Sequence, residues 1–373
     1  MTATGSATDA LTDLRRWLDE QAEVASLYHG VQVFAEQGGV PVFEHAAGID
    51  GEGNPMAADR IGMVRCALVK PAIAITIASL VEQGAMRYED TVADLLDAPM
   101  HAEVAALPVW TLLAHRAGVH DLGGDFLTVF PPEKRRAIVR LSPLAPGFVP
   151  GDEFGYSEAA GGVVLGEIIE AVTGRAYHEV LDELIVGPAG AGDDLFVRFD
   201  DERYDRLQHR IGVNAWMDSD PRTPYLLERS RLFATDWNPG FGGYATARGL
   251  VAMYRLFLDV LAERRVVAGV SRQAIEEIRA PLPRPTNLPD DVTLVYSYGF
   301  NHGFSSLGVP DHRVDHAFGH SGYGTAFAFA DSSLDLAVGI RYTGHTDEVA
   351  HKYLRLGRVI EHIYEAVDPE VGS

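Results

Sequence analysis

Lys70 lies on a predicted helix and is a candidate general base. The stretch RCALVKPAIAITIASLVEQG, residues 65–84, carries apolar residues at helical spacing, with Lys70 one turn from its start. On a helix, positions 67 and 70 share a face, and position 67 holds Ala67. Burial among apolar neighbours lowers the pKa of a lysine and makes it a usable general base. The alternative is a lysine whose ammonium group reaches solvent past the helix start, and this helix alone favours that interpretation.

A tyrosine follows in a glycine-bounded loop. The stretch PGDEFGYSEAAGG places Tyr156 next to Ser157 and Glu158, just before an apolar helical pattern. A tyrosine beside a cationic lysine is held nearer to its phenolate form and can exchange protons with a reacting group. Taken alone, such a tyrosine is more often a packed aromatic side chain.

A third stretch, AFGHSGYGTAFAFAD, opens a predicted strand with small residues. His320, Ser321, Gly322 and Tyr323 stand at its start. Glycine lets a ligand approach backbone N–H groups closely, and the amides of an edge strand can bind an oxyanion. We therefore expect these four residues to lie at a substrate site.

Two further patterns contain histidine. His115 and Arg116, in LLAHRAGVHDL, end a short predicted helix, and catalytic and structural roles suit them equally. A metal site is disfavoured for the second group, because its spacings do not fit one face of a helix or strand: His312, Asp315, His316 and His320. We therefore expect no metal site, and no other motif in the sequence demands a cofactor.

The elements that must position these residues come from both ends of the chain. Residues 11–21 have the pattern of an amphipathic helix, and residues 30–48 predict a hairpin around a Gly-Gly turn. Strands return within residues 296–342, and helical spacing returns over residues 349–367. We predict an α/β (α+β) fold in which an antiparallel sheet from both chain ends is flanked by helices. The predicted parts are a sheet domain of residues 1–60 and 285–373 and a mostly helical insert, 61–284, with the active site between them.

The segment from residue 200 to residue 239 fits no regular element. It is charged, and it contains prolines and several aromatic residues, among them Trp216 and Trp237. Aromatic side chains on a long loop can form a substrate wall, so both tryptophans are candidate substrate-binding residues. The alternative is that they anchor the loop on the body of the protein.

Composition excludes several classes of partner. The chain has 373 residues and a formal net charge of −22, which repels nucleic acid and anionic lipid. Its single cysteine, Cys66, excludes an internal disulfide and a cysteine-rich metal site. No segment approaches the roughly 20 uninterrupted apolar residues of a membrane span, and the first residues lack the pattern of a signal peptide. We expect a cytoplasmic protein that binds neither nucleic acid nor membrane.

Taken together and in order, these motifs resemble the serine β-lactamase and penicillin-binding-protein superfamily, in the class C-like branch that includes D,D-peptidases, esterases and acyltransferases. The SxxK, YxN and HxG motifs of that family correspond here to ALVK (67–70), YSE (156–158) and HSG (320–322). LLAHRAG, PGDEFGYSEAAGGVVLGEIIEAVTG and GFGGYATARGL also resemble family stretches. The resemblance runs from about residue 25 to the end, with residues 195–236 and 265–295 poorly covered.

The resemblance implies a β-lactamase/transpeptidase-like fold with its active site in a cleft, and no cofactor. In the family a serine attacks an ester, amide or lactam carbonyl, the lysine and tyrosine handle its proton, and the third motif helps to bind the oxyanion. Lys70, Tyr156 and His320 match by position. Ala67 stands at the nucleophile position and prevents formation of an acyl-enzyme. Glu158 replaces the usual amide, and its charge would raise the pKa of Lys70.

Three hypotheses of function follow. The first is an esterase, amidase or transacylase for a cytoplasmic, biosynthetic small-molecule substrate, whose nucleophilic serine is replaced by Ala67 in this chain. The second is a natural non-acylating enzyme in which Lys70, Tyr156 and Glu158 act as acid and base. The third is a ligand-binding protein without catalysis. Attack by Cys66 is disfavoured, because it lies one position early, about 100° around a helix from position 67.

Overall fold

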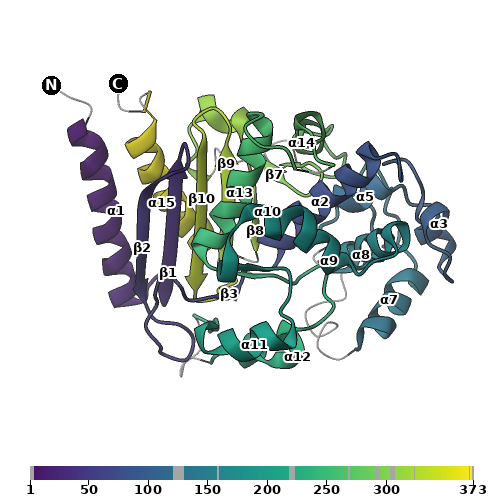
Figure 1. Cartoon of the computed structure of the whole chain (residues 1–373), viewed down its shortest axis with the longest axis horizontal. Coiled ribbons are helices and arrows are strands. Elements are labelled where there is room, and N and C mark those ends of the chain that lie inside the picture. Colours follow the sequence, from purple (N-terminus) through teal and green to yellow (C-terminus); the bar gives the residue numbers. More distant parts are fainter. Residues whose placement is uncertain are drawn as a thin grey trace.

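The strands of the main sheet come from the two ends of the chain, and a helical region extends from one side of it (Figure 1). This computed structural model describes residues 4–120, 130–157, 159–217, 223–267, 269–289, 295–302, 307–322, 324–368 and 370–371. Among the described residues, no helix is both long and apolar enough to cross a membrane.

In the described part of the chain, seven antiparallel strands form the main sheet in the order β2-β1-β10-β9-β8-β7-β6. Their bounds are β1 Gly30–Gln37, β2 Val40–Gly48, β6 Val295–Tyr296, β7 Asn301–His302, β8 Ala317–Gly322, β9 Ala326–Asp331 and β10 Leu336–Thr343. The first hairpin turns at Gly38 and Gly39, both with positive φ, as the Gly-Gly pair predicted. The prediction of one antiparallel sheet built from both chain ends is confirmed.

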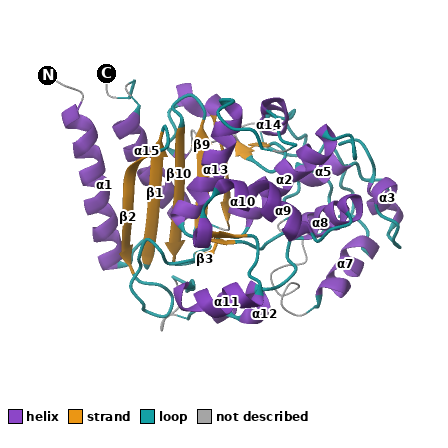
Figure 2. Cartoon of the chain, in the orientation of Figure 1, coloured by secondary structure: helices purple, strands orange, loops and turns teal. Residues whose placement is uncertain are grey.

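Helices cover both faces of this sheet (Figure 2). The terminal helices α1 (Thr4–Val24) and α15 (Val349–Val367) pack together on one face, and α13 (Ala247–Leu261) and α2 (Cys66–Glu82) lie on the other. On β10, Val338 and Ile340 join the core under the terminal helices. Gly339, between them, lies against the backbone of α13. This alternation is what a strand buried on both faces requires.

The remaining elements lie mostly in the helical region. The helices are α3 Val92–Leu95, α4 Ala102–Ala105, α5 Val109–Leu113, α7 Pro132–Leu141, α8 Ala160–Thr173, α9 Tyr177–Leu181, α10 Gly187–Ala189, α11 Asp201–Leu207, α12 Arg231–Ala234 and α14 Arg272–Arg279. Short segments of π or 3-10 helix span η1 Asp182–Val186, η2 Gly192–Asp194, η3 Gln208–Arg210, η4 Leu226–Arg229 and η6 Asp311–His316. A small sheet joins β3 Gly62–Met63, β5 Tyr244–Ala245 and β4 Leu195–Phe196 in the order β3-β5-β4.

The predicted division at residues 60 and 285 stays a prediction. One buried apolar cluster runs from Phe34 on β1 through α2 and α13 to Ile169 on α8, so the hydrophobic core is shared by the two predicted parts. Helix α13 belongs to the predicted insert by sequence but packs on β1, β9 and β10. α8 ends at Gly174, which adopts the left-handed conformation that glycine tolerates best.

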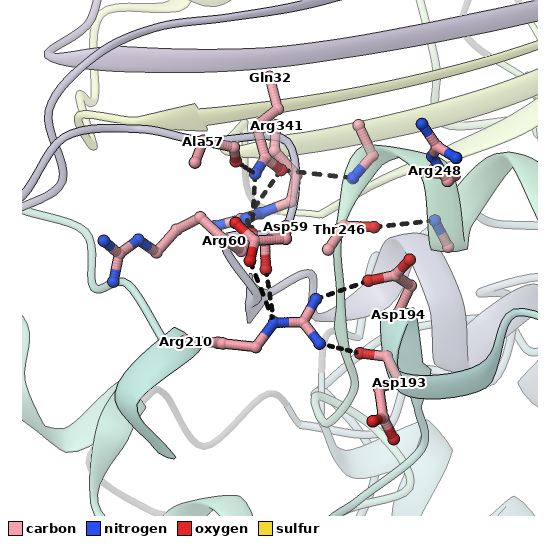
Figure 3. A network of polar contacts seen from close by, with 12 residues as sticks. Gln32, Ala57, Asp59, Arg60, Asp193, Asp194, Arg210, Thr246, Arg248 and Arg341 are labelled. Carbon is pink, nitrogen blue, oxygen red and sulfur yellow. Dashed lines mark hydrogen bonds and ion pairs between the residues drawn. The ribbon is translucent and has the colours of Figure 1, made fainter. Parts of the chain in front are cut away.

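A buried polar network ties the main sheet to the segment that leads into α2 (Figure 3). Arg341 on β10 donates hydrogen bonds from Nη1 to Gln32 Oε1 at 3.1 Å and to the carbonyl oxygen of Arg60 at 2.6 Å. Gln32 Nε2 donates to the carbonyl oxygens of Ala57 and Arg60. Burial lowers the pKa of Arg341 to about 10, so the guanidinium stays protonated at neutral pH. A side chain on Gly62 would overlap this guanidinium.

Candidate active site

Helix α2 begins with a strained turn and buries its first residues. Arg65, at its N-cap, has φ 52° and ψ −134°. A non-glycine residue in such a region costs on the order of 1–3 kcal/mol and persists only where its surroundings hold it. Ala67 is fully buried, and Lys70 is 8% exposed. The interpretation of Lys70 as a partly desolvated lysine, rather than one that reaches solvent, is therefore the one that the structure supports.

Lys70 contacts the loop that carries the predicted tyrosine. Its Nζ donates a hydrogen bond to the carbonyl oxygen of Ser157 at 3.0 Å and lies 5.1 Å from the centre of the Tyr156 ring. Tyr156 is 37% exposed, so its ring has Lys70 on one side and access to solvent. The loop leads directly into α8, where the N–H of Gly161 donates to Ser157 Oγ at 2.8 Å. The fold thus joins two motifs that are far apart in the sequence.

His115 contacts the same loop through the Tyr156 ring and the backbone of Ser157. Its ring centre lies 4.3 Å from that of Tyr156, and its Nδ1 accepts a hydrogen bond from the N–H of Ser157 at 3.2 Å. Burial lowers the pKa of His115 well below its usual value, and the neighbouring Lys70 and His320 lower it further. The imidazole is therefore neutral with its proton on Nε2. His115 thus lies within the candidate site.

The third motif lies on β8, against the start of α2. His320 is fully buried, and its Nδ1 donates to the carbonyl oxygen of Ser321 at 2.6 Å. Burial, and then the charge of Lys70, lower the pKa of His320 to about 3. A β-carbon built on Gly322 would lie 3.4 Å from the β-carbon of Ala67 and would overlap the carbonyl oxygen of Val64. Only glycine lets the strand approach position 67 this closely.

These contacts define what the arrangement can do chemically. A lysine with a nearby phenol can move a proton, and strand amides beside the α2 N-terminus can bind a developing oxyanion. The side chain of Ala67 has no atom that could attack a carbonyl. The only cysteine of the sequence, Cys66, is buried and donates from Sγ to the carbonyl oxygen of Gly240 at 3.7 Å. That contact gives Cys66 the role of a small buried side chain, in agreement with the expectation that it does not attack the substrate.

Of the other predicted site residues, the structure describes some and leaves others outside the described ranges. Glu158 and Tyr323 lie outside the described residues. Ser321 lies on β8 beside Gly322. Trp216 is half-buried, and it makes a T-shaped contact with His345, with 4.2 Å between the two ring centres.

Trp237 packs inside the helical region. Its Nε1 donates to Glu170 Oε1 at 2.8 Å, and the Arg136 guanidinium lies 3.8 Å from its ring. A T-shaped contact to Tyr177 completes its surroundings. These contacts favour the interpretation of Trp237 as a loop anchor over its candidate role in substrate binding.

No group of three metal-ligating side chains occurs within the described ranges. His312 pairs with Asp368 at 3.0 Å, on the side of the sheet that carries the terminal helices, whereas His320 is buried against Lys70.

The sequence analysis did not identify Arg65, Asn214 and Glu228, which form a buried cluster beside the start of α2. Asn214 and Glu228 come from the unassigned segment, where no periodicity or motif marks them.

Comparison with known proteins agrees with this geometry. A model of the Beta-lactamase family matches residues 15–358, and the chain therefore belongs to that family. A comparison with curated protein sequences finds no match. The chain has the β-lactamase/transpeptidase-like fold that its motifs implied.

Solved structures of the same fold align over nearly the whole chain. A family VIII carboxylesterase is 22% identical, with a TM-score of 0.74 and coverage of 98% of each chain. A penicillin-binding-protein homologue from Caulobacter crescentus is 22% identical, with a TM-score of 0.73 and coverage of 96% of this chain and 97% of the other. EstCE1, described as a hydrolase with promiscuous acyltransferase activity, is 16% identical, with a TM-score of 0.76 and coverage of 95% and 99%.

Proposed function

We propose that this chain carries the site of an acyl-transfer enzyme for a small-molecule ester or amide, with Ala67 at the position of the nucleophile. The observation that supports this proposal most directly is the contact between Lys70, one turn of α2 from position 67, and Tyr156, together with the close approach of Gly322 on β8 to Ala67. Structural neighbours include an esterase, a hydrolase with acyltransferase activity and a D-amino acid amidase from Ochrobactrum anthropi SV3. A cytoplasmic, biosynthetic substrate stays a prediction.

With a serine at position 67, the hydroxyl oxygen would attack the substrate carbonyl and pass its proton to Tyr156 in its phenolate form, which the Lys70 ammonium would stabilise. The oxyanion would accept hydrogen bonds from backbone N–H groups at the start of α2 and at the Gly322 end of β8, which lies between β9 and β7 rather than at the edge of the sheet. Tyr156 would return the proton to the departing alcohol or amine as the ester or amide bond breaks, and water or a second nucleophile would then release the acyl group. Because His115 and His320 are neutral, Lys70 supplies the positive charge among these three groups. With Ala67 the attack is impossible, so we propose that the chain as it stands binds the substrate without acylation.

The proposal is tested by replacing Ala67 with serine, which supplies a hydroxyl group at the nucleophile position. We expect Ala67→Ser to react with p-nitrophenyl butyrate in a burst, with intact-mass spectrometry showing one butyryl group on the peptide that contains residue 67. The unchanged chain and Ala67→Gly are the controls and should give no adduct. Absence of both burst and adduct from folded Ala67→Ser would contradict the proposal.

A second candidate is favoured by one specific observation. The Lys70–Tyr156 contact is formed although no nucleophile is present. We therefore also consider a non-acylating enzyme, in which these two residues and Glu158 move protons on a bound small molecule. Unchanged turnover of its substrate by Tyr156→Phe and Glu158→Gln would exclude this candidate. Binding of a ligand with no turnover would favour the purely ligand-binding hypothesis instead.

A further inference from the structure

Glu228 is a buried carboxylate that the proposed chemistry does not use. It lies in the single turn η4 and is 2% exposed. Its Oε1 accepts a hydrogen bond from Arg65 Nη2 at 2.9 Å, and its Oε2 accepts one from the backbone N–H of Asn214 at 2.8 Å. The Asn214 amide donates to both carboxylate oxygens at 3.1 Å. The Tyr244 hydroxyl donates to the backbone carbonyl of Glu228 at 2.7 Å. Both the side chain and the backbone of Glu228 are therefore held.

The partner of this carboxylate stands at the entrance to α2. Arg65 follows β3, lies two residues before Ala67, and has the left-handed φ described above. Its guanidinium lies 4.6 Å from the centre of the Phe241 ring and is enclosed with Glu228. On the backbone, the N–H of Val64 donates to the carbonyl oxygen of Gly243 at 2.9 Å. The turn is thus fixed by its backbone on one side and by the Arg65 side chain on the other.

The conformation of this turn decides where position 67 points. A residue with a β-carbon and positive φ relaxes toward common backbone angles unless its surroundings prevent it. Removing the charge of Glu228 would break the buried ion pair with Arg65, and loss of one member of a buried ion pair is strongly destabilising, so the Arg65 side chain and its turn would rearrange. Because Arg65 and Ala67 are joined by only one residue, that movement would rotate the first turn of α2.

We propose that Glu228 is a positioning residue, which holds Arg65 and thereby fixes the direction of the side chain at position 67 toward β8. The inference rests on the proposed function in one respect, because it takes position 67 as the reacting position. Its structural part stands independently, since it predicts a local opening of the α2 entrance.

Cys66 offers a direct readout of that opening. It is the only cysteine of the sequence, it lies between Arg65 and Ala67, and it is buried. We expect Glu228→Gln to raise the rate of Cys66 alkylation by iodoacetamide under native conditions at least about tenfold, because local opening exposes the thiol. Intact-mass spectrometry measures this rate.

The matched control is Asp368→Asn. Asp368 is likewise buried and pairs with Arg313 at 2.8 and 2.9 Å, but it follows α15 on the opposite side of the sheet. Each variant is labelled at a temperature that lies the same number of degrees below its own melting temperature. We expect Asp368→Asn to change the rate of Cys66 labelling little. Equal labelling of the two variants, or no rise with Glu228→Gln, would overturn the positioning role.

Two further measurements distinguish failure of the proposed function from failure of the positioning role of Glu228. In the Ala67→Ser background, Glu228→Gln should lower the acylation rate constant at least about tenfold with little change in substrate affinity. If Ala67→Ser is not acylated at all, the proposed function fails, while Cys66 labelling still decides the role of Glu228. If Glu228→Gln does not fold, Asn214→Ala, which weakens the cluster but keeps the ion pair, should raise labelling by a smaller factor, and no rise would overturn the proposal.

Discussion

The Lys70 ammonium lies 5.1 Å from the centre of the Tyr156 ring and donates to the carbonyl oxygen of the next residue, Ser157, at 3.0 Å. This contact joins α2 to the loop before α8 and brings the two proposed proton-transferring groups together. Because His115 and His320 are neutral, neither adds a positive charge beside them. Removal of Lys70 should therefore affect chemistry more than removal of either neutral histidine.

We expect Lys70→Met in the Ala67→Ser background to lower the acylation rate at least about 100-fold, the usual contribution of a positioned acid or base. The rate of butyryl adduct formation measures the effect. Lys134→Met, which removes a lysine on α7 whose ammonium lies 4.3 Å from the Phe130 ring centre, is the control and should leave acylation unchanged. Similar rates for Lys70→Met and its parent would contradict the role of Lys70.

The buried histidines predict a loss of stability in acid. The pKa of His320 is about 3 in the folded protein and 6.5 as an ordinary value, so between these values the unfolded chain binds a proton that the native chain does not. Its contribution to stability is therefore constant above about pH 6.5 and declines by about 1.4 kcal/mol per pH unit below it. Urea unfolding of the chain and of His320→Gln, at several pH values from 7 to 5, measures the difference.

We expect the free energy of unfolding of His320→Gln to fall less steeply with acid than that of its parent. The corresponding replacement of the exposed His209 by Asn is the control for loss of a histidine as such. Parallel curves for His320→Gln and its parent would show that His320 is protonated in the native state.

Gly322 sets how closely β8 approaches α2. A methyl group at this position overlaps the carbonyl oxygen of Val64, so Gly322→Ala should force the strand away and destabilise the protein by about 1–3 kcal/mol. In contrast, a β-carbon on Gly357, within α15, would lie 3.7 Å from the carbonyl oxygen of Leu307, which is an ordinary contact distance. Gly357→Ala should therefore stabilise the protein by up to about 1 kcal/mol. Thermal unfolding of both variants tests the contrast, and equal shifts would contradict it.

Gln32 links β1, β10 and the segment before β3. Its side chain accepts from Arg341 Nη1 and from the N–H of Ala247, and donates to two backbone carbonyls. Gln32→Leu leaves these buried groups without their partner and should cost about 1–3 kcal/mol. Gln37→Leu, at the more exposed end of the same strand, is the matched control and should cost less. Urea unfolding measures both, and an equal loss would show that the network around Arg341 adds no stability.

The sequence by itself determined the local elements and the order of the motifs. Apolar periodicity predicted α2, α8 and α15, and the Gly-Gly pair predicted the first hairpin, because these features depend on residues close together in the chain. The ordered motifs also indicated the family and the position of Ala67. Such patterns need no knowledge of distant contacts, so one sequence is enough to find them.

Only the tertiary structure decided what surrounds those motifs. Glu228 pairs with Arg65 across 163 positions of sequence, and the His115 ring contacts the Tyr156 ring across 41. Trp237 was as good a candidate for a substrate wall as Trp216 until its contacts with Glu170 and Arg136 placed it in the helical region. Pairings of this kind leave no periodic signal, because they depend on how separate elements pack. The neutral state of His115 and His320 follows from burial beside Lys70, which only packing creates.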